Sequence, residues 1–242
     1  MYDFENFTMS VMIDIGAGLR RADERAKSME EVAENAVNLL RNAFTDPETG
    51  ESGCALVRLY KTHALGKLEP RTRKFASDLL SSEDLNDSVR CLTLLATCGD
   101  KPEWNDRYLS NGHLPIPLPS KDVVNSIPMV SQLLLQLGIS VEHVIAPDPN
   151  LVIELSERSY GVFHVEDAVG SPYVPAQDFV VAHNIRSALG FGGILPSGDV
   201  FAVILFSHPS ISRVVADRFR SLALQLKVAL LSFSDEQTFK AT

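Results

Sequence analysis

The stretch Ile185–Ser207, which reads IRSALGFGGILPSGDVFAVILFS, decides the fold. Two apolar runs flank residues 196–199, a turn sequence in which proline presets φ and glycine permits positive φ. The stretch therefore predicts a β-hairpin. Its second arm, residues 200–206, is apolar at every position, which predicts a strand covered on both faces.

The first arm of the hairpin alternates in side-chain size. Successive side chains of a strand point to opposite faces, so the arm has a large-residue face and a small-residue face. The large face carries Ile185, Ser187, Leu189, Phe191 and Leu195, and the small face carries Ala188, Gly190 and Gly192. We expect helices from the two ends of the chain to pack on the small face, and the large face to line a pocket.

The bulk composition is that of a soluble globular protein. The chain has 242 residues, 45% of them hydrophobic and 22% charged, which suits a single core. A formal charge of −9 argues against the basic surface that nucleic acid or an anionic membrane would require, so we expect neither as a partner. No signal peptide or apolar run of about 20 residues is present, so we expect a cytoplasmic protein or a soluble piece of a larger chain.

The three cysteines do not indicate a disulfide framework. Cys91 and Cys98 lie seven residues apart in one apolar run, so in a regular strand they would face opposite sides and could not share a metal. We interpret them, with Cys54, as buried free thiols. Neither a metal-binding spacing nor a serine-nucleophile motif occurs.

Both ends of the chain carry helical patterns. Ser28 and Glu31 form a capping box that starts a helix after an earlier helix within residues 6–26, and the last helix begins near Ser210 or Ser212. The end helices have coiled-coil-type apolar seams. The seams are Met12, Ile15, Leu19, Ala22, Ala26 and Met29, and Val215, Phe219, Leu222, Leu226, Ala229 and Phe233.

The middle of the chain predicts short strands around one irregular segment. The expected strands are residues 54–60, 89–97, 151–155 and 161–165, with helices at 128–137 and 178–183. Residues 69–82 are charged and could be a short helix or an exposed excursion. Residues 99–125 are rich in proline, and an irregular segment of this length is often a lid or a binding loop.

From Gly161 onward the chain resembles the second half of a GAF domain. Ile185-Arg186-Ser187 enters a strand as in that family, Pro196-Ser197-Gly198 takes the place of its hairpin turn, and residues 202–207 match its next strand. The resemblance extends over residues 28–232. It implies an α+β fold, in which an antiparallel sheet carries the N- and C-terminal helices on one face and a loop-covered pocket on the other.

The resemblance also implies a role. GAF domains usually bind a small molecule, dimerise through their end helices and signal to an attached effector such as a kinase or cyclase. We therefore divide the chain into a dimerisation and signalling helix (1–27), a bacterial sensor domain (28–234) and a tail (235–242). The cyclic-nucleotide signature is absent and no cysteine has a bilin-attachment context, so the ligand stays unknown, with haem or another small molecule open.

The expected pocket is formed by the large face of the hairpin and is closed by Tyr108, Met129, Leu133 and Phe163. The candidate ligand-binding residues are Ser187, Leu189, Phe191, Phe163, His164, Tyr108, Met129, Gln132 and Arg90. We assign no catalytic residue and no metal ligand, and expect a non-enzymatic sensor. Two alternatives stay open. One is a redox enzyme that uses Cys91 or Cys98, like the methionine sulfoxide reductases of GAF fold, and the other is a ligand-free dimerisation scaffold.

Overall fold

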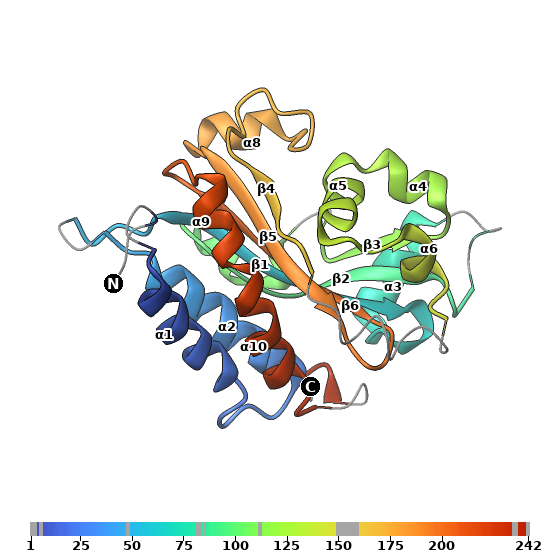
Figure 1. Ribbon diagram of the computed structural model, residues 1–242. Helices are drawn as coiled ribbons and strands as arrows, with labels where there is room; N and C mark the ends of the chain where they lie inside the picture. The colour runs from blue at the N-terminus through green and yellow to red at the C-terminus, as the bar shows by residue number, and fades with distance from the viewer. Residues whose placement is uncertain are drawn as a thin grey trace.

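The structure is a computed structural model that describes residues 4, 7–46, 49–80, 84, 86–110, 113–148, 160–233 and 237–240. One six-stranded antiparallel sheet runs through it in the order β3-β2-β1-β6-β5-β4 (Figure 1). Its strands are β1 (Cys54–Ala64), β2 (Arg90–Gly99), β3 (Pro115–Leu118), β4 (Phe163–Val165), β5 (Ser187–Ile194) and β6 (Val200–Ser207). The expected strand at 151–155 lies outside the described residues.

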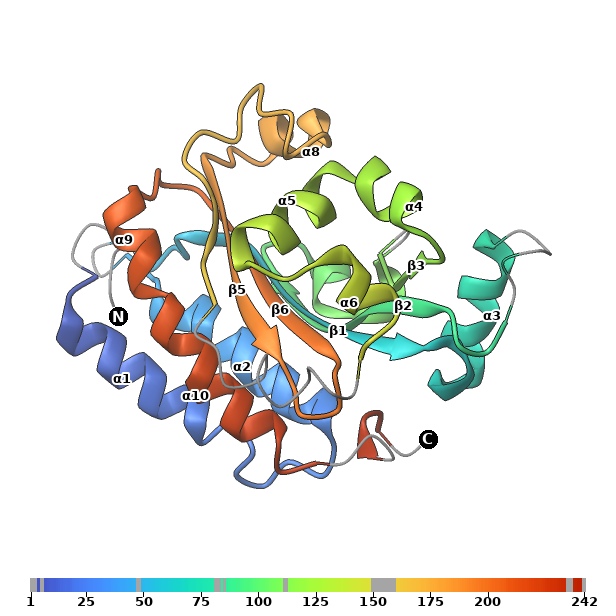
Figure 2. The ribbon, with the colours of Figure 1, turned by 45° about the vertical axis from the view of Figure 1, so that its right-hand side comes forward.

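Helices cover the two faces of the sheet in separate layers (Figures 1 and 2). The first layer comes from the chain ends and consists of α1 (Met9–Arg20), α2 (Met29–Ala43), α9 (Arg213–Arg218) and α10 (Arg220–Leu230). The second comes from the middle and consists of α4 (Lys121–Ser126), α5 (Pro128–Leu137) and α6 (Val141–Ile145). The expected α+β class, with the terminal helices on one face of an antiparallel sheet, is confirmed.

The remaining elements lie at the rim of the sheet. They are α3 (Pro70–Leu79), α8 (Gln177–Ala182) and the 3-10 helices η1 (Leu65–Lys67), η2 (Pro102–Asn105) and η3 (Arg107–Leu109). The irregular segment 99–125 thus contains η2, η3, β3 and most of α4, and the charged segment 69–82 contains α3. Among the residues that the structure describes, no helix is both long enough and apolar enough to cross a bilayer.

Local signals set the ends of the predicted helices. The Ser28 hydroxyl accepts a hydrogen bond from the Glu31 N–H (3.2 Å), and the Glu31 carboxylate accepts one from the Lys27 N–H (2.7 Å). In a standard capping box the Glu31 carboxylate would accept from the Ser28 N–H, whereas here it accepts from the N–H of the preceding residue, Lys27. Helix α2 still starts where the sequence predicts. Helix α5 has the predicted bounds and ends at Gly138, whose φ of 75° is the left-handed conformation that favours glycine.

The hairpin forms as predicted, but the expected assignment of its faces was wrong. Leu189 and Phe191 pack into the core beneath the terminal helices, and Phe191 lies 6.0 Å from Phe219 between ring centroids. The small face instead meets the middle layer, where a Cβ on Gly190 would lie 3.0 Å from Leu133 Cδ1. The alternation of β5 reveals two faces, but it does not specify which helices cover each one.

The expectation that Cys91 and Cys98 face opposite sides was also wrong. The register of β1 and β2 shifts between Leu59 and Tyr60, which leaves Leu95 as an extra residue in β2. Both cysteines therefore pair with odd-numbered residues of β1 and lie on the same face of the sheet, where Cys98 packs beneath the terminal helices and Cys91 in a separate small cluster. Seven residues of strand still separate them by about 20 Å, so a shared metal stays excluded.

Candidate functional site

The sequence-predicted binding residues do not form one site. Leu189 and Phe191 are fully buried among the terminal helices. The Ser187 hydroxyl links two backbone segments, because it donates to the Glu166 carbonyl (2.6 Å) and accepts from the Ile211 N–H (2.9 Å).

Four more of these residues belong to the edge strand β4 and to α5. Phe163 is fully buried in the core between the sheet and α5, and Met129 packs against that core. Gln132 is half-buried. His164 ties β4 to its surroundings, since its Nε2 lies 2.6 Å from the Ile211 carbonyl oxygen, outside this core. The place where we expected a pocket is thus occupied by packed apolar side chains.

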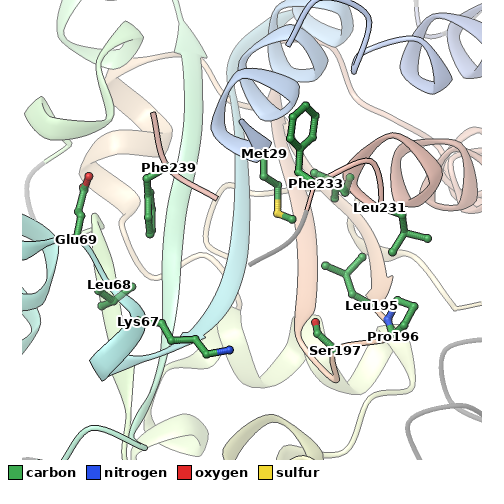
Figure 3. A pocket seen from close by; sticks show the side chains of 11 residues that line it. Met29, Lys67, Leu68, Glu69, Leu195, Pro196, Ser197, Leu231, Phe233 and Phe239 are labelled. Carbon is green, nitrogen blue, oxygen red and sulfur yellow. The ribbon is translucent and has the colours of Figure 1, made fainter. Parts of the chain in front are cut away.

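The last two, Arg90 and Tyr108, take part in separate polar networks at one end of the sheet. Between these networks the structure contains a cavity of about 890 Å³ (Figure 3). Its walls come from the β5–β6 turn, from η1 and the start of α3, and from the ends of the helical layer. The lining residues are Met29, Lys67, Leu68, Glu69, Leu195, Pro196, Ser197, Leu230, Leu231, Phe233 and Phe239. We take this sheet-end cavity as the candidate site.

Sequence reasoning missed the sheet-end cavity because its walls are distant in the chain. The sequence analysis names several of its residues, but it assigns Pro196 and Ser197 to a turn and Met29 and Phe233 to helical seams. In Figure 3, Leu68, Glu69 and Phe239 lie on one side and Leu195, Pro196 and Leu231 on the other. Most of these side chains are apolar, so the cavity offers hydrophobic contact over much of its wall.

A buried ion cluster supports the turn side of the cavity. The Lys61 ammonium, with a fully buried side chain, lies 2.8 Å from Asp199 Oδ2, and Arg90 pairs with the other carboxylate oxygen. The Ser197 hydroxyl, at the cavity wall, donates to Asp199 as well (2.9 Å). Burial opposes ionisation of Asp199, but Lys61 and Arg90 outweigh it and lower its pKa to about 2. Asp199 thus fixes the turn.

A second buried network supports the opposite side. Arg107 donates from Nε to Glu30 (2.8 Å) and from a terminal nitrogen to Glu69 (2.6 Å). Tyr108 and Thr72 also donate to Glu69, at 2.8 and 2.6 Å. These bonds and the Arg107 charge overcome the opposing effect of burial and hold the pKa of Glu69 below its usual value. The network joins α2, α3 and η3 at the cavity.

The three cysteines are buried away from solvent, and none of them lines the sheet-end cavity. Cys54, Cys91 and Cys98 are all buried as free thiols. Burial raises the pKa of each, that of Cys91 to about 12, so thiolates are scarce near neutral pH. Within the described part of the chain, no three His, Cys, Asp or Glu side chains come together as a metal site.

Comparison with known proteins finds similarity in solved structures alone. No family model matches the chain, and no curated protein does. The GAF domain of an Acinetobacter phosphoenolpyruvate-protein phosphotransferase is similar at 12% identity and a TM-score of 0.43, over 93% of this chain and 95% of that one. An N-acylhomoserine lactone-dependent LuxR-family transcription factor from Burkholderia cenocepacia gives 12% and 0.44, over 92% and 95%.

A further similar structure is the phycoerythrobilin-bound GAF domain of a cyanobacterial phytochrome, at 12% identity and a TM-score of 0.43, over 96% of this chain and 98% of that one. The antiparallel sheet and the layer of terminal helices across one of its faces are the arrangement that the resemblance of the sequence to GAF domains implies.

Replacement of Asp199 by Asn should be strongly destabilising. Asn removes the carboxylate charge that pairs with the buried Lys61 ammonium and with Arg90, and breaking a buried ion pair typically costs about 3–5 kcal/mol of unfolding free energy. Chemical denaturation at neutral pH measures the difference. The control is Asp217→Asn, which removes an exposed pair with Arg213 and should change stability by less than about 0.5 kcal/mol.

The same carboxylate predicts a pH dependence. Its pKa is lower in the folded state than its usual value of 3.8, so its stabilisation is complete above that value and is lost as the pH falls towards about 2. Between pH values of about 4 and 2, the unfolding free energy of the unchanged protein should fall by about 2 kcal/mol more than that of Asp199→Asn. An unfolding free energy that falls equally in the two proteins over this pH interval would contradict the assignment.

Proposed function

We propose that this protein is a small-molecule-sensing regulatory module of GAF-like fold, which binds its ligand without catalysis in the sheet-end cavity. One observation carries the proposal: the cavity contacts the terminal helical layer at one end, where α2 begins and α10 ends. Met29 is the first residue of α2, and Leu230 and Leu231 mark the end of α10. An occupant of the cavity therefore touches the helices directly.

The cavity favours a ligand with a mainly apolar body. Its volume lies within the range of small-molecule sites, roughly 300–1,000 Å³. The Ser197 hydroxyl, the Lys67 ammonium and the Glu69 carboxylate are the polar groups among its lining side chains. A few polar groups in an apolar wall orient a ligand, while the wall contributes most of the affinity.

Signalling requires that the ligand bind one arrangement of the helices better than another. The networks around Asp199 and Glu69 hold two walls of the cavity rigid, whereas the third wall consists of the ends of α2 and α10. We place the change in that third wall. The output would pass to an effector such as a kinase or cyclase, in a cytoplasmic bacterial setting.

The terminal helices would pass the signal between two copies of the chain. Ile13 of α1 and Leu224 of α10 are 58% and 61% exposed, and Met9 and Val228 are exposed on the same helices. Helices α1 and α10 pack side by side (Figure 1), with a mainly apolar groove of about 280 Å³ between them. Exposed apolar side chains on neighbouring helices are typical of an association surface, and a two-fold homodimer is the commonest assembly.

Buried, weakly acidic thiols support a sensor over the alternative of a cysteine-dependent redox enzyme. A reactive cysteine is exposed and has a lowered pKa, whereas the pKa values here are raised. We expect a chromogenic disulfide reagent to label the native protein slowly and all three cysteines rapidly after denaturation. Fast labelling of Cys91 or Cys98 in the native state would favour the redox enzyme instead.

Binding in the cavity can be tested with anilinonaphthalene sulfonate, a fluorescent apolar probe. The native protein should bind it saturably, and Leu231→Trp, which narrows the cavity with a bulkier side chain, should weaken binding by about ten-fold or more, equivalent to about 1.4 kcal/mol. Leu135→Trp is the control, because Leu135 is exposed on α5, away from the cavity. Equal binding by both variants would show that the probe binds elsewhere, and no saturable binding would favour the ligand-free scaffold.

The dimer can be tested by placing charge on the helices. Ile13→Glu together with Leu224→Glu should convert a dimer into a monomer in analytical ultracentrifugation, because two carboxylates on each copy would have to be buried. Val181→Glu, on an exposed apolar residue of α8, should leave the mass unchanged. A wild-type protein that stays monomeric at high concentration would overturn this part of the proposal.

A further inference from the structure

Residues 237–240 fold back onto the start of α2. The Glu30 N–H donates to the Thr238 carbonyl (2.8 Å), and the Lys240 N–H donates to the Glu30 carboxylate (3.0 Å). The Lys240 ammonium lies 2.7 Å from the Glu34 carboxylate at the surface. These contacts hold the Phe239 side chain against β1 and β2 of the sheet.

Phe239 occupies a slot with three kinds of wall. The ring of His63 lies 5.5 Å from the Phe239 ring between centroids, and the Arg107 guanidinium lies 5.2 Å from the Phe239 centroid. The third wall is a small apolar cluster formed by Leu65, Leu68, Ala76, Val89 and Cys91. An aromatic neighbour, a cation over the ring face and an apolar wall together suit a planar aromatic ring.

The slot is built independently of Phe239. Arg107 is fixed by its ion pairs with Glu30 and Glu69, and His63 lies on the central strand β1. The slot also opens onto the sheet-end cavity, because Leu68 lines both and Phe239, which occupies the slot, lies in the cavity wall (Figure 3). The ring of Phe239 therefore stands where the cavity would continue towards the sheet.

We propose that Phe239 is the intramolecular occupant of an aromatic subsite of this cavity, and that a ligand with a planar aromatic ring displaces it and releases residues 237–240 from α2. The inference rests on the proposed function, since the ligand enters through the same cavity. It names the ligand class and the segment that responds.

The contacts of the segment suit reversible release. The exposed Lys240–Glu34 pair contributes little, as exposed ion pairs generally do. When the Lys240 N–H leaves, Glu30 keeps its bond from Arg107 to the other carboxylate oxygen, so no unpaired buried charge results. Release also frees the Glu30 N–H at the first turn of α2, which couples the subsite to the terminal helices.

The test compares the affinity of full-length variants for anilinonaphthalene sulfonate, whose aromatic rings suit the slot. Phe239→Ala should bind it about five-fold or more tightly than the unchanged protein, because the competing occupant is gone. The matched control is Phe233→Ala, which removes another aromatic side chain of the cavity wall that lies outside the slot. It should not tighten binding.

A second variant weakens the segment without changing the slot. Lys240→Glu should tighten probe binding by about two- to three-fold, and combining it with Glu34→Lys should restore the original affinity because the ion pair is re-formed with reversed charges. Saturating probe should also accelerate chymotrypsin cleavage after Phe239 in the unchanged protein, seen by mass as loss of residues 240–242.

The outcomes separate this inference from the proposed function. If the unchanged protein, Phe239→Ala and Lys240→Glu bind the probe equally, and the probe does not accelerate cleavage after Phe239, the displacement of Phe239 is overturned while binding in the cavity stands. If no variant binds the probe saturably, both are overturned. Should Phe239→Ala fail to fold, Lys240→Glu and its charge-reversed partner decide.

Discussion

The structure depends on the need to cover both faces of its two central strands. β1 and β6 are buried along almost their whole length, so a single layer of helices would leave one apolar face in water. The chain solves this with helices from its two ends on one face and helices from its middle on the other. Gly190 lets α5 approach the sheet closely, while Phe191 fills the wider space beneath the terminal helices.

This double coverage also determines where a ligand can bind. Closely packed interiors have no room for a small molecule, so space arises where the layers diverge at the end of the sheet. There the turn held by Asp199 and the loops held by Arg107 form two firm walls, and the ends of α2 and α10 form the third. The cavity therefore lies at the end of the helical layer and not beneath the middle layer, where the family resemblance placed it.

The sequence predicted elements well and sites poorly, for a physical reason. Capping at Ser28, the glycine stop at Gly138 and the alternation of β5 are local signals, and each element they define is present. The facing of β5 and the bulge at Leu95 depend on distant partners, so Leu189, Phe191 and both β2 cysteines were assigned to the wrong surroundings. The candidate site joins segments up to 210 positions apart, as Met29 and Phe239 are (239 minus 29), and no local pattern reveals such an arrangement.

A site at the end of a helical layer has a mechanical advantage over one buried between sheet and helices. A ligand held in a central core could move α1 and α10 only by distorting a sheet whose six strands share their hydrogen bonds. At the sheet end, the occupant touches the first residue of α2 and the last turn of α10, where helix ends already have incomplete backbone bonding. Small changes there alter few hydrogen bonds and leave the sheet intact. In the function that we propose, the polar clusters on the other two walls would direct a displacement into α2 and α10, and α1 and α10 carry the exposed apolar side chains of the proposed dimer surface.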